Sequence, residues 1–310
     1  SLTQIDIDTL KKIMGEIRKT IPVGFEHHKE KQNIMLMPDL NYEELPIARE
    51  QYQAALKQIG TLGGGNHFIE IQKGDDSHIW IMIHSGSRNF GLKIADYYNK
   101  LAIKLNAKWH SLVPRTWDLA FLPVDSEEGQ SYIKEMNYAI DFAFANRKLM
   151  MGRIFDIFKN ETGYYVLNND RLEGMINIAH NYASLENHFG ENVMVHRKGA
   201  TLAQTDTIGI IPGSQGSSSY IVKGLGNPES FMSCSHGAGR KMGRKEAIRT
   251  LNLESEKKLL DDKGILHAIR GQQDLEEAPS AYKPIDIVMA NQADLVEILV
   301  KLQPLAVIKG

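Results

Sequence analysis

The sequence predicts an α+β fold, because stretches with helical spacing of apolar residues occur beside short apolar runs typical of strands. Helical spacing dominates the first half of the chain. Short apolar runs separated by Gly and Ser turns fill residues 192–235. Polar residues next to glycine are scattered from position 66 to position 309. We therefore expect residues 1–310 to form a single domain, in which a mixed sheet and flanking helices surround one central site.

Apolar residues at helical spacing predict four helices in the first half, at residues 5–19, 43–59, 89–109 and 130–159. The second of these is expected to end at Gly60. Between the helices, three glycines at 63–65 form a hinge that leads into a strand. The run at 79–83 predicts a second strand with His84 at its end.

The second half is predicted to contain strands at 193–195, 208–211 and 220–222, followed by a helix from about 239 to 251. Residues 291–302 are predicted to form another helix, because four apolar side chains share one face: Leu295, Ile298, Leu299 and Leu302. The apolar residues at 305–308 predict a final strand.

Composition limits the class of protein. The formal net charge of −2 gives no sign of a protein that coats nucleic acid through its overall charge, although a local basic groove is compatible with it. Cys234 is the only cysteine, which excludes an internal disulfide and favours a reducing cytoplasm. No apolar run is long enough for a membrane span, so no membrane contact is expected. The chain begins with Ser1 rather than Met, and we expect it to be incomplete at its N-terminus.

Four histidines stand beside small or polar residues: His67, His84, His180 and His236. A neutral imidazole is the commonest transition-metal ligand in proteins. Histidines in turns that bond to the backbone explain the same pattern, and the spacing of a zinc protease is absent. The small residues around His236, from Ser233 to Arg240, would let a bulky phosphorylated ligand approach it.

Residues 212–219 combine glycines with hydroxyl side chains, which indicates either an anion cradle or a plain hairpin loop. It is not a Walker loop, because no Gly-Lys-Ser/Thr follows. Cys234 is interpreted as a packing residue rather than a nucleophile. Glu70 has a carboxylate that could accept two N–H bonds from one edge of guanine, although, taken alone, Glu70 is better explained as a surface carboxylate on a strand.

Several short sequence motifs together resemble those of the RtcB family of RNA ligases, over about residues 55–310. They are Gly63–Glu70, His84–Arg88, His180–Tyr182, Arg197–Ala200, Pro212–Ser214, Ser235–Arg240 and Lys309–Gly310. The resemblance implies an enzyme that uses GTP and two Mn²⁺ ions to join an RNA 3′-phosphate or 2′,3′-cyclic phosphate end to a 5′-hydroxyl end. On this resemblance His236 is the catalytic residue and carries a covalent guanylate.

The resemblance also implies roles for individual residues. His67, His84 and His180 would bind metal, Glu70 and Lys309 would read the guanine, and Arg88 and Arg240 would hold phosphate charge. The residues expected to bind the nucleotide are Asn66, His67, Phe68, Ile69, Glu70, His180, Asn181, Pro212, Gly213, Ser214, Gln215, Ser219, His236, Gly237, Ala238, Gly239, Tyr282 and Lys309.

Two departures from the family pattern leave other interpretations open. The family's Asp-x-x-Cys-Gly motif, which supplies two more metal ligands before the glycine hinge, is absent from this sequence. Gln215 stands where many members of the family have methionine. A metal-dependent phosphoesterase could use the same histidines, and a non-catalytic relative could bind GTP or RNA alone. The sequence identifies neither the physiological RNA nor an activating protein.

Overall fold

The computed structural model describes residues 4–41, 43–163, 172 and 174–310. It divides into two compact units, and each is described by itself. The first unit comprises residues 1–26, 62–84 and 150–310, and the second comprises residues 27–61 and 85–149. The prediction of a single domain stays a prediction.

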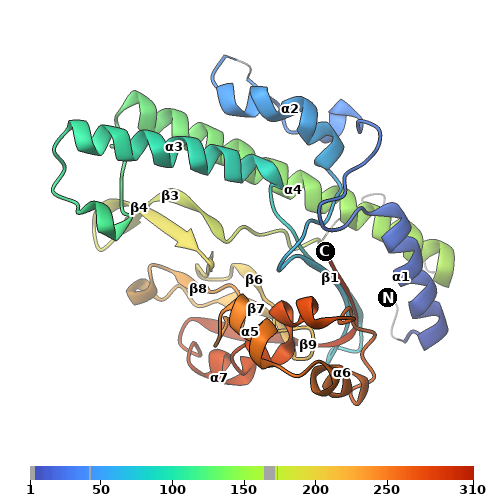
Figure 1. Cartoon of the computed structure of the whole chain (residues 1–310). Helices are drawn as coiled ribbons and strands as arrows, with labels where there is room; N and C mark the ends of the chain where they lie inside the picture. The colour runs from blue at the N-terminus through green and yellow to red at the C-terminus, as the bar shows by residue number, and fades with distance from the viewer. Residues whose placement is uncertain (1–3, 42, 164–171, 173) are drawn as a thin grey trace. The chain divides into compact units, whose positions relative to one another are not determined.

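The first unit is built on a five-stranded sheet in the order β2-β1-β9-β7-β6. Figure 1 labels β1, β9, β7 and β6 of this sheet. Its strands are β1 (Phe68–Gly74), β2 (Ile79–His84), β6 (Ile208–Ile211), β7 (Ser219–Gly224) and β9 (Val296–Lys309). Each neighbouring pair is antiparallel, so the α+β class is confirmed but the sheet is not mixed. Short connections such as that between β1 and β2 permit only antiparallel pairing.

The register of the sheet brings distant residues of the chain together. Phe68 lies opposite His84 on one side and opposite Lys309 on the other. Successive side chains of a strand point to opposite faces. Ile69 and Ile71 therefore enter the hydrophobic core, while Phe68 and Glu70 face the other way.

Helix α1 (Ile7–Thr20) packs into that core. Asp6 caps the helix by accepting hydrogen bonds from the backbone N–H groups of Asp8 and Thr9. The buried side chains of Ile13 and Ile17 contact the same cluster as Ile69 and Ile308 of the sheet. One face of this sheet is thus filled by apolar packing, which leaves the other face available for a site.

The remainder of the first unit carries small sheets and short helices. The β3–β4 hairpin (Asn181–His188 and Glu191–Lys198) is followed by the β5–β8 pair (Ala200–Leu202 and Ser233–Ser235). The helices are α5 (Arg244–Thr250), α6 (Leu253–Asp261) and α7 (Ile285–Ala290), with 3₁₀ turns at Pro228–Ser230, Gln272–Glu277 and Pro279–Ala281.

The second unit is helical. Helices α2 (Pro46–Gln58) and α3 (Asn89–Lys108) share a hydrophobic cluster with the first part of α4 (Glu127–Thr162), and 3₁₀ turns lie at Ile34–Leu36 and Arg115–Trp117. The carboxylate of Glu135 accepts from the backbone N–H groups of Ile47 and Ala48, which caps α2 through a distant side chain.

The predicted helix at 291–302 is wrong, because residues from Val296 onward form β9. Leu295, Ile298, Leu299 and Leu302 have helical spacing, but pairing with β1 and β7 overrides this local pattern. The helix predicted from about 239 begins only at Arg244. Helices α6 and α7 were not predicted.

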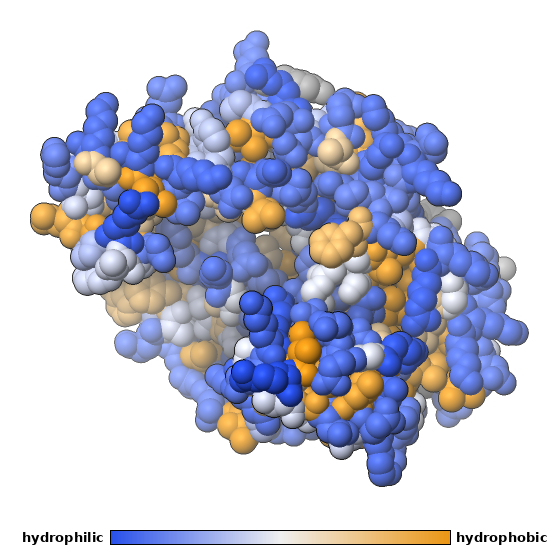
Figure 2. Space-filling model, viewed as in Figure 1, coloured by the Kyte–Doolittle hydropathy of each residue, from blue (hydrophilic) through white to orange (hydrophobic). Residues whose placement is uncertain are grey.

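The surface of the face in view in Figure 2 is mostly hydrophilic, and hydrophobic residues gather in separate patches. Within the described residues, no helix combines the length and the apolar character that crossing a membrane requires.

Candidate functional site

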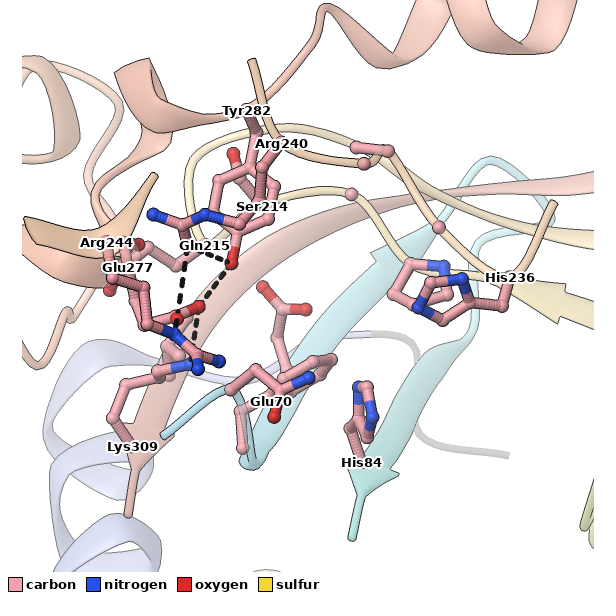
Figure 3. A pocket seen from close by; sticks show the side chains of 18 residues that line it. Glu70, His84, Ser214, Gln215, His236, Arg240, Arg244, Glu277, Tyr282 and Lys309 are labelled. Carbon is pink, nitrogen blue, oxygen red and sulfur yellow. Dashed lines mark hydrogen bonds and ion pairs between the residues drawn. The ribbon is translucent and has the colours of Figure 1, made fainter. Parts of the chain in front are cut away.

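A cavity of about 250 Å³ lies in the first unit, on the face of the sheet that bears Phe68 and Glu70. Segments from β1, β2, the 212–215 loop, the 236–240 loop and the end of β9 meet there (Figure 3). The lining residues are Asn66, Phe68, Glu70, His84, Pro212, Gly213, Ser214, Gln215, His236, Gly237, Ala238, Gly239, Arg240, Arg244, Glu277, Tyr282, Val307 and Lys309.

Glu70 places a buried carboxyl group in this cavity, with only 3% of the residue exposed. Its Oε2 accepts a hydrogen bond from Nε2 of Gln72 at 2.9 Å, while its Oε1 has no hydrogen-bond partner among the described residues. Burial raises the pKa of Glu70 to about 8, against the opposing effects of Lys309 and Gln72. Such an unsatisfied acceptor is suited to a ligand that brings N–H donors.

Gln72 links this carboxyl group to the loop at residues 212–219. The Nε2 of Gln72 also donates to Oγ of Ser219 at 3.0 Å, and that hydroxyl accepts from the backbone N–H of Gly213 at 3.1 Å. Gln72 and Ser219 are fully buried. Gln72 was not predicted from the sequence, although it alternates with Phe68 and Glu70 on the same strand and could have been found from that spacing.

Glu277 gathers four polar side chains at one end of the cavity, where Figure 3 shows the ion pairs. Its carboxylate pairs with Arg240 at 3.2 Å, Arg244 at 3.1 Å and Lys309 at 3.7 Å, and it accepts a hydrogen bond from the hydroxyl of Tyr282. Burial lowers the pKa of Lys309, and the acidic groups around it oppose that effect. Glu277 was also missed, since no local spacing distinguishes it in the sequence.

Two of these cations also lie against aromatic rings. The guanidinium of Arg240 stands 5.1 Å from the ring centre of Tyr282, and the Lys309 ammonium stands 5.7 Å from that of Phe68. This end of the cavity therefore combines aromatic faces, positive charge and the Glu70 carboxyl group.

The four predicted histidines meet in space. The rings of His67 and His84 have centres 5.8 Å apart, those of His84 and His180 are 5.2 Å apart, and those of His180 and His236 are stacked at 4.6 Å. Desolvation holds the pKa of His84 well below its usual value, and His180, His67, His236 and Lys309 add to the effect. The His84 imidazole is therefore neutral at pH 7, as a metal ligand must be.

Part of this cluster fits a metal. The Nε2 atoms of His84 and His180 lie 3.3 Å apart, which is close enough for both to bind one metal ion. Nδ1 of His67 donates to the Leu62 carbonyl at 2.9 Å, which leaves Nε2 as the lone-pair nitrogen. Across the described parts of the chain, no three His, Cys, Asp or Glu side chains form a complete metal-binding group.

His236 has one ring nitrogen occupied and one available. Its Nδ1 lies 2.6 Å from the carbonyl oxygen of Gly199, so Nδ1–H donates, and in the neutral tautomer that this bond selects Nε2 carries the lone pair. Gly199 has φ +66°, and a Cβ there would lie 3.1–3.2 Å from ring atoms of His236. Its N–H bonds to the His180 carbonyl and to Oδ1 of Asn181, so the start of β3 positions the catalytic candidate through Gly199.

The loop at 212–219 lies beside the His236 segment. The backbone N–H of Ala238 donates to the Pro212 carbonyl at 3.0 Å, and a Cβ on Gly237 would lie 3.1 Å from the same oxygen. A Cβ on Gly213 would come within 2.2 Å of the Ser218 carbonyl, so glycine is required there. The Ser214 N–H is already bonded to Oγ of Ser217, so an incoming anion would have to replace that bond.

Most predicted nucleotide contacts line the cavity, but five do not: His67, Ile69, His180, Asn181 and Ser219. Ile69 lies in the hydrophobic core with its side chain away from the cavity, so only its backbone could serve a ligand. Arg88 belongs to the second unit, where its Nε donates to the Thr61 hydroxyl.

Known proteins of similar sequence identify the family of this chain. The family model described as "tRNA-splicing ligase RtcB" matches residues 40–310. The chain is 42% identical to the RNA-splicing ligase RtcB of Escherichia coli K12 over 255 residues, which cover 82% of this chain and 62% of that protein. It is 33% identical to the tRNA-splicing ligase RtcB of Thermococcus kodakarensis, over 85% of this chain and 62% of that protein.

A third relative matches almost the whole chain. The tRNA-splicing ligase RtcB of Nanoarchaeum equitans is 31% identical, over 99% of this chain and 72% of that protein. The chain thus spans about 62% of the length of the first two relatives. With a family match over residues 40–310 and relatives at 31–42% identity, this chain belongs to the RtcB family.

Proposed function

We propose that this chain carries the catalytic core of an RNA ligase that joins an RNA 3′-phosphate or 2′,3′-cyclic phosphate end to a 5′-hydroxyl end. The observation that carries the proposal is the state of His236. Its Nδ1–H is held by the Gly199 carbonyl, and the ring stands in a cavity that also contains Glu70 and three cationic side chains. This arrangement supplies a neutral nucleophilic nitrogen beside a place for a nucleoside triphosphate.

The guanine of GTP is proposed to occupy the end of the cavity near Glu70 and Lys309. The unpartnered Oε1 of Glu70 would accept from the N–H groups on one edge of guanine, and Phe68 and Tyr282 would contact the base. Ligand donors would favour the ionised carboxylate and lower its pKa from the value of about 8. The free energy of that change contributes to selection of guanine.

The reaction would begin with attack of Nε2 of His236 on the α-phosphorus of GTP, with pyrophosphate as the leaving group. The guanylate would pass to the RNA 3′-phosphate, and the RNA 5′-hydroxyl would then displace GMP. Arg240 and Arg244 border the cavity at the end that holds Glu277 and Lys309, where they would add positive charge around the bound nucleotide. A cyclic phosphate end would first be opened by water.

Manganese is the proposed metal, with two ions expected. His84 and His180 would hold it through their adjacent Nε2 atoms, and His67 would add a third nitrogen. Bound Mn²⁺ would neutralise phosphate charge and stabilise the leaving oxygen. The described residues supply only part of a ligand set, so further donors would come from the substrate or from protein outside these residues.

A labelling experiment tests this function. The chain is incubated with Mn²⁺ and GTP labelled on its α-phosphate, and acid-labile label on the protein is measured. We expect label on the native chain and none on His236→Ala, because that variant lacks the nucleophile. His196→Ala is the matched control, since His196 is an exposed histidine on β4 outside the cavity.

Two other outcomes would contradict the ligase proposal, and each would identify one of the alternative functions. Nucleotide that binds without covalent label would indicate a non-catalytic GTP- or RNA-binding relative. Metal-dependent release of phosphate without label would indicate a phosphoesterase.

The proposed cellular location is the cytoplasm, which the single unpaired cysteine favours.

A further inference from the structure

A second cavity of about 280 Å³ lies in the first unit and shares no lining residue with the first. Residues of α1, the end of α6 and the segment that follows α6 surround it. The lining residues are Lys11, Met14, Arg18, Asp261, Ile265, Leu266, His267 and Arg270. The volume equals that of roughly nine water molecules at about 30 Å³ each, which is more than one phosphate group needs.

Three cations at this cavity have no acidic partner. Lys11, Arg18 and Arg270 form no ion pair with a carboxylate among the residues that the structure describes. Lys11 and Arg18 are seven residues apart, which places them two turns apart on one side of α1. The pKa of Arg18 is lowered by burial and by the positive charge of Arg270, so the two guanidinium groups repel each other.

The one acid that lines the cavity is paired with a histidine of the same lining. Asp261 accepts from Nε2 of His267 at 3.2 Å. The Lys, Arg and Asp side chains of the lining carry three positive charges and one negative charge, a formal charge of +2. A charge of this size complements a phosphate dianion. One arginine guanidinium can donate two parallel hydrogen bonds to two oxygens of a phosphate.

The floor of the cavity is firmly attached to the sheet. Met14 and Ile265 are each 4% exposed and His267 is 8% exposed. Leu266 donates its N–H to the Leu305 carbonyl and accepts from the Val307 N–H, which fixes the segment along the edge of β9. Nδ1 of His267 is buried and has no hydrogen-bond partner among the described residues. The exposed side chains of Lys11, Arg18 and Arg270 therefore border a preformed hollow whose floor is buried.

We propose that the cavity lined by Lys11, Arg18, His267 and Arg270 binds a phosphate group. Two sources share this chemistry: a free phosphate or phosphate monoester, and the backbone phosphate of an RNA. The RNA source rests on the proposed ligase function, whereas binding of inorganic phosphate does not. Repulsion between Arg18 and Arg270 would be relieved by the bound anion.

The first experiment locates inorganic phosphate. The chain is labelled with ¹³C in its histidine rings, and the His267 signal is assigned by its loss in His267→Gln. We expect phosphate to shift this signal and chloride at equal ionic strength to leave it in place. Phosphate bound in the reaction cavity would shift His236 instead, so the two cavities are distinguished.

Charge-removing variants test which side chains bind. The double variant Arg18→Gln/Arg270→Gln should weaken the phosphate affinity measured at His267 by about tenfold or more, because it removes two charge-assisted hydrogen-bonding groups. Lys12→Gln is the matched control, since it removes one charge from the same helix outside the cavity, and its affinity should change less than about twofold. Thermal unfolding of each variant shows whether it has folded.

An RNA without reactive ends, with hydroxyl groups at both termini, tests the second source. Its affinity is measured against salt concentration, and the double variant should reduce the slope of log K against log salt by about 0.7 for each phosphate that the variant no longer binds. Labelling of His236 with GTP should be unchanged in this variant. Absence of that label in the native chain would defeat the ligase proposal while leaving the phosphate result standing. The proposal is overturned if neither phosphate nor RNA shifts the His267 signal and neither binds the double variant more weakly than it binds Lys12→Gln.

Discussion

Gly199→Ala should impair guanylation of His236 far more than it impairs folding. The substitution adds a Cβ at 3.1–3.2 Å from Cε1 and Nδ1 of His236, where contacts of 3.4 Å or more are ordinary. The ring must shift by a few tenths of an ångström, and its 2.6 Å hydrogen bond to the Gly199 carbonyl is disturbed. A displacement of about 1 Å near reacting groups can cost about 100-fold in rate, so we expect a decrease of about tenfold to 100-fold.

The backbone cost of this substitution can be measured separately. Gly199 has φ +66°, and an alanine in that region costs about 1–2 kcal/mol. Gly264 has φ +68°, and no atom lies within 4 Å of the place that an added Cβ would take. Gly264→Ala therefore carries the same strain without the contact to His236.

The assay is the initial rate at which labelled GTP modifies the protein, together with the thermal midpoint of each variant. Both variants should lose similar stability, while only Gly199→Ala should lose rate. Equal rates in the two variants would refute the argument that Gly199 positions His236.

Three further predictions concern acidic side chains. Glu277→Gln should weaken GTP labelling and lower the thermal midpoint, because Arg240 and Lys309 lose their shared carboxylate; unchanged labelling would contradict this. Glu70→Gln should reduce the preference for GTP over inosine triphosphate, measured by competition for labelling, since one base-reading acceptor becomes a donor. Hydrogen bonds to the Glu186 carboxylate lower its pKa from 4.5 to about 2, and the bond from Arg197 has the largest effect. Its contribution to stability is present above about pH 4.5 and lost as pH falls toward 2, so urea unfolding of Glu186→Gln should lack this acid dependence.

The sequence predicted the elements in which local pattern and tertiary packing agree. The apolar face of α1 coincides with the face that enters the core, so its helical spacing was a reliable guide. In β9 the two disagree: Leu295, Ile298, Leu299 and Leu302 favour a helix, but two neighbouring strands supply hydrogen bonds that a local pattern cannot reveal.

The candidate site was predictable where histidines stand beside small or polar residues. His67, His84, His180 and His236 were all found in this way, and the structure brings their rings within 6 Å of at least one other member of the group. Glu277 could not be found, because its significance comes from Arg240, Arg244 and Lys309, which approach it from other parts of the chain. Long-range convergence of charge leaves no periodic signal in a sequence.

The most direct test is to identify the atom that carries the guanylate. After reaction with GTP and Mn²⁺, the protein is digested at alkaline pH, the modified peptide is located by mass spectrometry, and ³¹P NMR distinguishes the two imidazole phosphoramidates. Because Nδ1 of His236 is bonded to the Gly199 carbonyl, the account predicts GMP on Nε2 of His236. GMP on Nδ1, on Lys309 or on any other residue would contradict it.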